Sequence, residues 1–260
     1  MIAAHRRVAG PEGLWVCALA LLVPPPAGAQ GDTGPVGGNL AATSDYLYRG
    51  VSQSDGHGAL QGDLHASSSG GTFAGVWAST RDSDLAPGTD AEVQLYLGQH
   101  IGLGSAWSVT LSGRAAYYVG GSPRHSDDYQ EIAAAFTWLD RYTLSLAVIP
   151  NAVRYSPYPS YYYVYRSAAL VADGAGQWLL RGGLFGGNLY LTAAAGYYYS
   201  SRPDHGPPPA LGYLYGNAGL ALEWRRWRLD VGYFATQERA EELFPYPLAN
   251  RLAGTLTWQF

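Results

Sequence analysis

Cysteine is almost absent from this sequence of 260 residues, because Cys17 is its single cysteine. Cys17 lies in the apolar part of a segment interpreted below as a signal peptide, and it follows the bulky Val16, so we do not expect lipid attachment there. Cleavage of that segment would leave the mature chain without cysteine. A disulfide framework and thiolate chemistry are therefore excluded.

Long hydrophobic runs are absent as well. After Gln30, no stretch approaches the roughly eighteen consecutive apolar residues of a membrane-spanning helix, so a helical membrane protein is excluded. Charged residues make up only 14% of the chain, and the net charge of -4 argues against a nucleic-acid partner. With 34 glycines and 21 tyrosines, the composition fits a β-protein that shows apolar side chains to something other than water.

The amino-terminal residues have the three parts of a secretory signal peptide. Arg6 and Arg7 form a basic start, an apolar core of about ten residues follows, and small residues precede a cleavage site after Ala29. The apolar core is too short to cross a bilayer as a helix. We expect three parts in the chain: a cleaved signal peptide over residues 1–29, a loosely ordered lead over residues 30–38, and one outer-membrane β-barrel over residues 39–260.

Alternation of apolar and polar residues predicts strands from Asn39 to the end of the chain, with no helical period long enough to interrupt them. The last stretch shows this most clearly, because Leu252, Leu256, Trp258 and Phe260 share one parity and polar residues share the other. The pattern predicts an all-β fold, a transmembrane antiparallel β-barrel of about twelve strands. The expected strands are approximately 39–51, 58–68, 72–81, 90–101, 105–119, 128–138, 142–150, 160–172, 188–200, 211–224, 227–237 and 249–260. Residues 173–187 leave three alternatives open: a thirteenth strand, an extension of a neighbour, or a long turn.

Two hairpins test this pattern within the sequence. A tight turn at residues 139–141 sets Trp138 opposite Tyr142, and it then matches outward residues with outward residues along both strands. A two-residue turn at residues 225–226 sets Glu223 opposite Arg228 on the polar face. Both hairpins therefore predict one apolar and one polar surface.

Connections alternate between short turns and longer loops, as they do in outer-membrane barrels. Aromatic residues follow the same division, and we expect two membrane-interface girdles. The tryptophan girdle beside the short turns comprises Trp107, Trp138, Trp224, Trp227 and Trp258. The tyrosine girdle beside the long loops comprises Tyr46, Tyr48, Tyr117, Tyr118, residues 161–163, residues 197–199 (among them Tyr197), Tyr213, Tyr215 and Tyr233.

The start of the predicted barrel carries a family resemblance. Residues 44–54 read SDYLYRGVSQS, residues 59–62 read ALQG, and residues 73–79 read FAGVWAS. This run closely resembles the opening of the TorF-type porins, proteobacterial outer-membrane proteins formerly known only as conserved hypotheticals. The strong part covers about residues 40–80, and Gly58 stands where a proline is expected. The resemblance implies an outer-membrane porin barrel, and it supplies no substrate.

Charged residues on the polar parity are the candidate pore-lining set, and both signs occur among them. They are Asp45, Arg49, Asp63, Glu92, Arg114, Glu131, Glu223, Arg228, Asp230 and Arg251. In one interpretation they tune which solutes pass through a water-filled lumen. In the other, they pair with each other and plug a narrow interior, because the width of a twelve-stranded barrel falls between filled and open barrels.

Residue types suited to catalysis or metal binding occur in two loops. One holds His125, Asp127 and Asp128, and the other holds Asp204 and His205. Neither has an elbow-like nucleophile motif or a second histidine, so we predict no catalytic site, metal site or cofactor.

The sequence thus predicts a porin of the bacterial outer membrane that lets small solutes or ions diffuse through a mixed-charge lumen. The alternatives are a non-conducting structural or adhesive barrel and, third, a barrel hydrolase. The predicted partners are outer-membrane lipids, the diffusing solutes, and the barrel-assembly machinery, which would engage the last strand ending in Phe260. Selectivity, an open lumen and the oligomeric state do not follow from the sequence.

Overall fold

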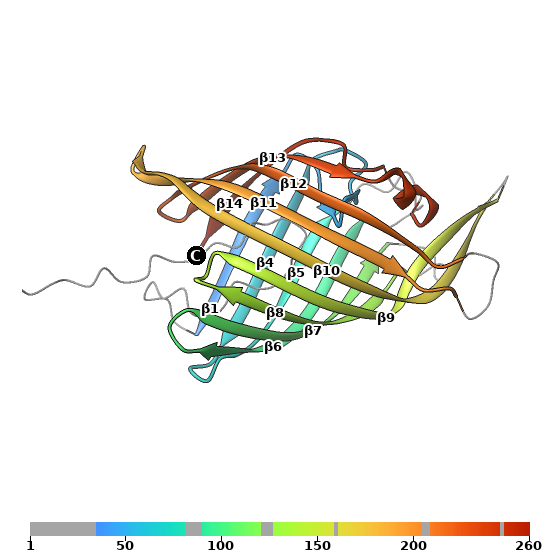
Figure 1. Ribbon diagram of the computed structural model, residues 1–260, viewed down its shortest axis with the longest axis horizontal. Helices are drawn as coiled ribbons and strands as arrows, with labels where there is room; N and C mark the ends of the chain where they lie inside the picture. The colour runs from blue at the N-terminus through green and yellow to red at the C-terminus, as the bar shows by residue number, and fades with distance from the viewer. Residues whose placement is uncertain (1–34, 82–89, 121–126, 159–160, 204–208, 245–246) are drawn as a thin grey trace, which may run out of the picture.

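Antiparallel strands form a closed barrel in the computed structural model, which describes residues 35–81, 90–120, 127–158, 161–203, 209–244 and 247–260 (Figure 1). Within these ranges the barrel has twelve strands, so the predicted fold class is confirmed. They are β1 (Val36–Thr43), β4 (Ala59–Ser67), β5 (Thr72–Thr80), β6 (Ala91–Leu103), β7 (Trp107–Val119), β8 (Tyr129–Trp138), β9 (Tyr142–Tyr158), β10 (Tyr161–Leu184), β11 (Gly187–Ser200), β12 (Leu211–Trp224), β13 (Trp227–Thr236) and β14 (Arg251–Gln259).

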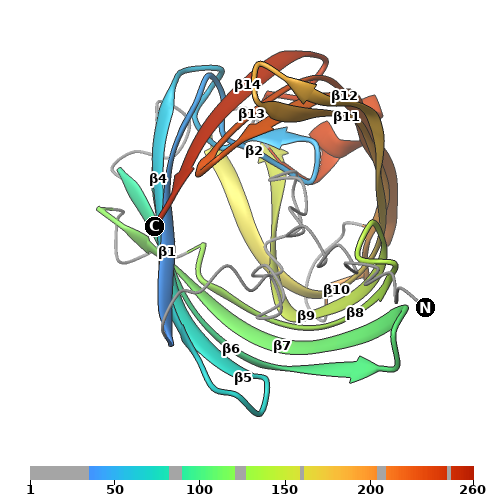
Figure 2. The ribbon, with the colours of Figure 1, turned by 90° about the vertical axis from the view of Figure 1, so that its left-hand side faces the viewer.

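The first and last strands close the barrel. β1 pairs with β14 from Asn39↔Gln259 to Thr43↔Thr255, and its other edge pairs with β4. Every strand in the barrel order therefore has two neighbours, and no edge is left open to another chain. Figure 2 shows the strands as a ring around an interior that holds β2 (Leu47–Tyr48), which pairs with β3 (Val51–Ser52).

The two faces of the wall differ as the alternation predicts. Leu60, Leu97 and Ile132 point outward and are each 66% exposed, whereas Glu92 and Gln94 point inward and are each 1% exposed. An apolar surface facing outward costs free energy in water but not in hydrocarbon, at roughly 25 cal/mol per Å². The inward polar side chains form hydrogen bonds with one another in the barrel interior, as Glu92 does with Tyr46 and Gln94. This is the arrangement of a membrane barrel.

The predicted hairpin registers are confirmed. Trp138 pairs with Tyr142 and Glu223 pairs with Arg228, and the intervening pairs match outward with outward residues. Residues 173–184 extend β10, so they form neither a thirteenth strand nor a turn. The connections at residues 68–71, 104–106, 139–141, 185–186 and 225–226 share one end of the barrel, called here the short-turn end. The opposite end is called the long-loop end.

The first strand differs from its prediction at both ends. β1 begins at Val36, inside the predicted lead, and it stops at Thr43 instead of continuing to residue 51. It stops there because the chain turns into the barrel interior, where Thr43 Oγ1 donates a hydrogen bond of 2.8 Å to the Asp45 carbonyl. Thr43 pairs directly with Ala59, so residues 44–58 lie outside the wall ladder.

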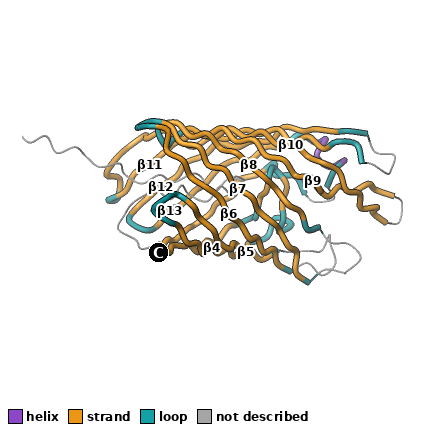
Figure 3. Tube along the Cα trace, turned by 90° about the horizontal axis from the view of Figure 1, so that it is seen from below, coloured by secondary structure: helices purple, strands orange, loops and turns teal. Residues whose placement is uncertain are grey.

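A single short helix occurs among the described residues, the 3-10 helix η1 (Glu238–Glu242) between β13 and β14 (Figure 3). None of the described helical segments has the length and apolar character needed to cross a membrane.

Tryptophans gather at the short-turn end. Trp107 stacks on Trp138 with ring centroids 5.9 Å apart, and contacts continue through Tyr142 to Trp178. On the other side, Trp227 contacts Trp258, and Trp258 contacts Phe260 at 5.3 Å. Trp224 lies opposite Trp227 beside the same turn. Their contact with a membrane interface stays a prediction.

The predicted tyrosine girdle is wrong for several members. Tyr46, Tyr198, Tyr213 and Tyr215 are buried in the interior, and Tyr48 and Tyr118 pack against the buried cluster. In the strands, neighbouring tyrosines alternate between faces, so only one of each adjacent pair can point outward. Tyr117 and Tyr197 do so, at 43% and 44% exposure, as do Tyr199 and Tyr233. The side chains of residues 161–163 lie outside the described part.

Candidate functional site

The candidate site is the lumen together with residues 44–58, called here the inserted segment. This segment leaves the wall after β1, forms the two-residue strands β2 and β3 inside the barrel, and rejoins the wall at β4. Arg49, Val51 and Ser54 are each no more than 3% exposed. The segment is therefore part of the packed interior.

Local chemistry explains how the inserted segment turns. Arg49 and Gly50 both have positive φ, 48° and 80°, as the two central residues of a type I′ turn require. At Gly50 a Cβ would lie 2.3 Å from Thr236 Oγ1, so this position needs glycine for space as well as for conformation. The Asp45 carboxylate then accepts hydrogen bonds from Ser52 Oγ at 2.5 Å and from Ser54 Oγ at 3.1 Å.

Contacts tie the inserted segment to the wall at β6, β7 and β8. Arg49 forms an ion pair of 2.9 Å with Glu131, which also accepts a hydrogen bond of 2.8 Å from Arg114. Arg114 donates a second bond, of 2.6 Å, to the Tyr48 hydroxyl. Tyr46 donates to Glu92 at 3.1 Å. One buried carboxylate, Glu131, thus holds two cations, one from the segment and one from the wall.

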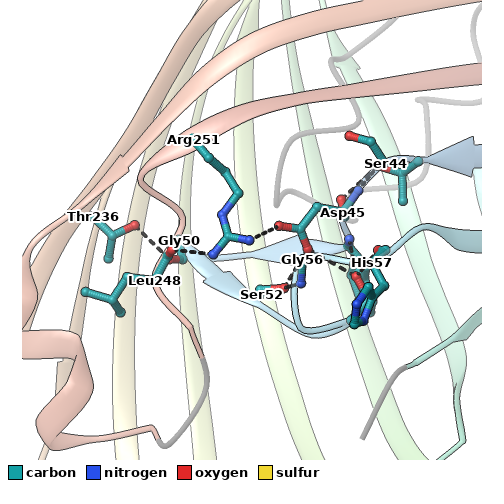
Figure 4. Close-up of polar contacts among 12 residues, drawn as sticks. Ser44, Asp45, Gly50, Ser52, Gly56, His57, Thr236, Leu248 and Arg251 are labelled. Atoms are coloured by element: carbon teal, nitrogen blue, oxygen red, sulfur yellow. Dashed lines mark hydrogen bonds and ion pairs between the residues drawn. The ribbon is translucent and has the colours of Figure 1, made fainter. Parts of the chain in front are cut away.

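Other contacts tie the segment to β12, β13 and the connection before β14. The Gly50 carbonyl accepts from Thr236 Oγ1 at 2.7 Å and from the Ala249 amide at 2.9 Å, and the Arg49 carbonyl accepts from Tyr213 at 3.0 Å. Figure 4 shows Arg251 reaching Asp45, at 3.4 Å. In the barrel order, β7 and β13 are diametrically opposite. The inserted segment therefore spans the lumen.

Charge and burial fix the protonation of the segment. Burial alone would lower the pKa of Arg49, but the Glu131 carboxylate and the neighbouring tyrosines raise this pKa well above its ordinary value. Arg49 therefore remains a cation. Burial, and then the Glu92 carboxylate, raise the pKa of Tyr46, so its hydroxyl remains a hydrogen-bond donor.

One bacterial protein family matches more than half of the chain. The model of the bacterial family Gcw_chp, described as a bacterial protein of unknown function, matches residues 28–167. The chain belongs to the Gcw_chp family. The match includes the inserted segment, and it does not carry the TorF name expected from that stretch. No curated protein matches the chain.

Two solved structures resemble this Gcw_chp protein in fold. The NanC porin superposes with a TM-score of 0.52 at 11% identity, over 85% of this chain and 97% of that one. The KdgM porin gives a TM-score of 0.47 at 8% identity, over 86% of this chain and 98% of that one. The likeness to the NanC porin shows a shared barrel fold.

Inside the barrel, the predicted pore-lining residues divide into groups. Arg49, Arg114 and Glu131 form the cluster around the inserted segment, which we call the crossing cluster. A second cluster, the hairpin cluster, lies toward the short-turn end, where Arg228 binds Asp230 at 2.7 Å and also binds Glu223. The predicted Glu223–Arg228 pair is thus present. Four residues remain: Asp45 of the inserted segment, Arg251 of β14, Asp63 and Glu92. Asp45 pairs with Arg251, Asp63 binds His65 and Tyr96, and Glu92 binds Tyr46.

Most of these charges are covered instead of lining an open channel. Arg251 is more exposed than the others, with 36% of its side chain exposed. The sequence did contain a signal for the inserted segment: two serines and a Gly-rich turn follow Asp45, and such residues favour turns over strands.

Only part of the two candidate catalytic loops lies among the described residues. His125, Asp204 and His205 lie outside the described residues. Asp127 and Asp128 are described, and the Tyr155 hydroxyl and the Tyr118 amide donate hydrogen bonds to them. Over the described ranges, no group of three potential metal ligands comes together.

Proposed function

We propose that this protein is a narrow porin of the outer membrane, in which small solutes or ions diffuse past a constriction formed by the inserted segment. The observation that carries the proposal is the mixed-charge interior of a closed barrel whose outer surface is apolar. Diffusion through the lumen needs no catalysis, so the proposed role is non-enzymatic.

The proposed lining follows the charges already described, and Arg251 of β14, which pairs with Asp45 of the inserted segment, is the most exposed of them. Export by a signal peptide over residues 1–29, assembly through the strand that ends in Phe260, and lipid contact by the outward aromatics belong to the same proposal. Each of these stays a prediction.

One observation favours the second candidate, a non-conducting barrel. The inserted segment is bonded to opposite sides of the wall, and most of its side chains are buried. A segment fixed in this way could close the lumen to solutes. The two candidates differ in the current that the intact barrel carries.

Conductance of the purified protein in a planar bilayer separates them. Because Thr43 and Ala59 pair directly, a two-residue Asn-Gly turn can replace residues 44–58 without moving the wall register. We expect ohmic steps from the intact protein and larger steps from this variant. Silence of the intact protein with large steps from the variant would favour the non-conducting barrel, and silence of both would overturn the porin proposal. Retention of the β-sheet circular dichroism spectrum is the control for folding.

A further inference from the structure

A pocket lies between the inserted segment and the long-loop end of the barrel. It encloses about 550 Å³ of space between atoms, including space that is open to solvent. Its walls are aromatic, formed by Tyr48, Tyr118, Tyr155, Tyr198, Tyr213 and Phe244. Two of these rings, Tyr198 and Tyr213, stack with centroids 5.5 Å apart. An apolar, aromatic hollow with a few polar groups is the common form of a small-molecule site.

Two residues that line the same pocket carry hydrogen-bond donors without acceptors. Arg49 uses Nη2 to bind Glu131, while its Nε and Nη1 atoms are buried and have no partner. The Tyr129 hydroxyl is also buried without a partner. Arg49 is 3% exposed and Tyr129 is 7% exposed. Buried donors lose their water, so leaving them unpaired destabilises the fold unless something else accepts from them.

The unpaired groups are of one chemical kind. Among the described residues that line the pocket, no side-chain carboxylate or amide oxygen is buried without a partner. The one carboxylate of the lining, Asp127, accepts a hydrogen bond from Tyr155. Arg49 and Arg81 are the cations of the lining, and Arg49 keeps two donor atoms without an acceptor although it is paired with Glu131. The lining therefore favours a ligand that accepts hydrogen bonds and carries negative charge.

We propose that this pocket binds a small organic carboxylate. Its oxygens accept from Arg49 and Tyr129, and its apolar body packs on the tyrosine walls. Charge-assisted hydrogen bonds to an arginine are among the strong ones, and they strengthen further where water is excluded. Binding at this site is saturable, whereas passive diffusion through the lumen requires no binding site.

Binding to the intact, detergent-solubilised protein tests the site, with benzoate as the probe and benzamide as its neutral counterpart of nearly the same shape. Titration calorimetry should show saturable benzoate binding and an affinity for benzamide that is lower by about tenfold or more. Inorganic phosphate should also bind more weakly than benzoate, because it has no apolar body. Equal binding of benzoate and benzamide, or the absence of saturable benzoate binding, would overturn the proposal.

Tyr129→Phe supplies the decisive variant. It removes a hydroxyl that has no partner among the described residues, so the fold should be unaffected, while benzoate affinity should fall about tenfold. Tyr117→Phe, on the outward face of β7, is the matched control and should bind as the unmodified protein does. Unchanged affinity in Tyr129→Phe would refute the assigned donor. These measurements need no conductance, so a silent bilayer experiment leaves the carboxylate site standing.

Discussion

The crossing cluster and the hairpin cluster are both buried groups of arginines and carboxylates, but they join different parts of the chain. Glu223, Arg228 and Asp230 belong to one hairpin, β12–β13, and their side chains meet because its register places them on one face. In the crossing cluster, Arg49 comes from the inserted segment, whereas Arg114 and Glu131 come from β7 and β8. The first cluster ties neighbouring residues together, and the second ties a segment to a distant wall.

Two similar arginine–carboxylate clusters therefore stabilise different things, depending on which parts of the chain they join. Loss of the hairpin cluster should weaken one hairpin and leave the inserted segment in place. Loss of the crossing cluster should weaken the fold and also release the inserted segment. Stability and conductance, measured together, can therefore separate the two.

Glu131→Ala should have the largest effect. It leaves Arg49 and Arg114 as buried cations without their shared carboxylate, and breaking such a pair costs about 3–5 kcal/mol. We expect this loss in the free energy of unfolding, measured with denaturant in detergent, and larger conductance steps as the segment is released. Unchanged stability and conductance would show that the crossing cluster does not hold the segment.

Arg228→Ala should have a smaller effect of the same kind, a loss of about 2–3 kcal/mol in the free energy of unfolding. It leaves Glu223 and Asp230 without their cation, but they lie in one hairpin near the short-turn end, where water can reach them more easily. The conductance should change less than in Glu131→Ala, because a lining charge is lost but the inserted segment keeps every contact described above. An increase equal to that of Glu131→Ala would abolish the distinction between the clusters.

Thr236→Val should have the smallest effect. The substitution keeps the shape of the side chain and removes one hydrogen bond, from Thr236 Oγ1 to the Gly50 carbonyl, which still accepts from the Ala249 amide. A loss of about 1 kcal/mol is expected. Hydrogen exchange should become faster at the amides of residues 44–58 and remain unchanged in β12–β13. Faster exchange across that hairpin would mean that Thr236 stabilises the wall instead of the segment.

Much of the barrel could be predicted from the sequence because it depends on local pattern. The opposition of Trp138 to Tyr142, and of Glu223 to Arg228, follows from turn length and alternation within a single hairpin. The inserted segment could not be predicted in the same way. Tyr46 and Tyr48 keep the parity of a strand, so a continuous β1 was the natural expectation, although the turn residues around them pointed elsewhere.

The sequence by itself determined the hairpin registers and the division into an apolar and a polar face, since each depends on residues near one another in the chain, and it left the strand count open only at residues 173–187. Tertiary structure alone decided that residues 44–58 cross the lumen, where the Arg49 carbonyl accepts a hydrogen bond from Tyr213. The physical reason is that a buried cation such as Arg49 needs a carboxylate, and Glu131 comes within reach only after the barrel has closed.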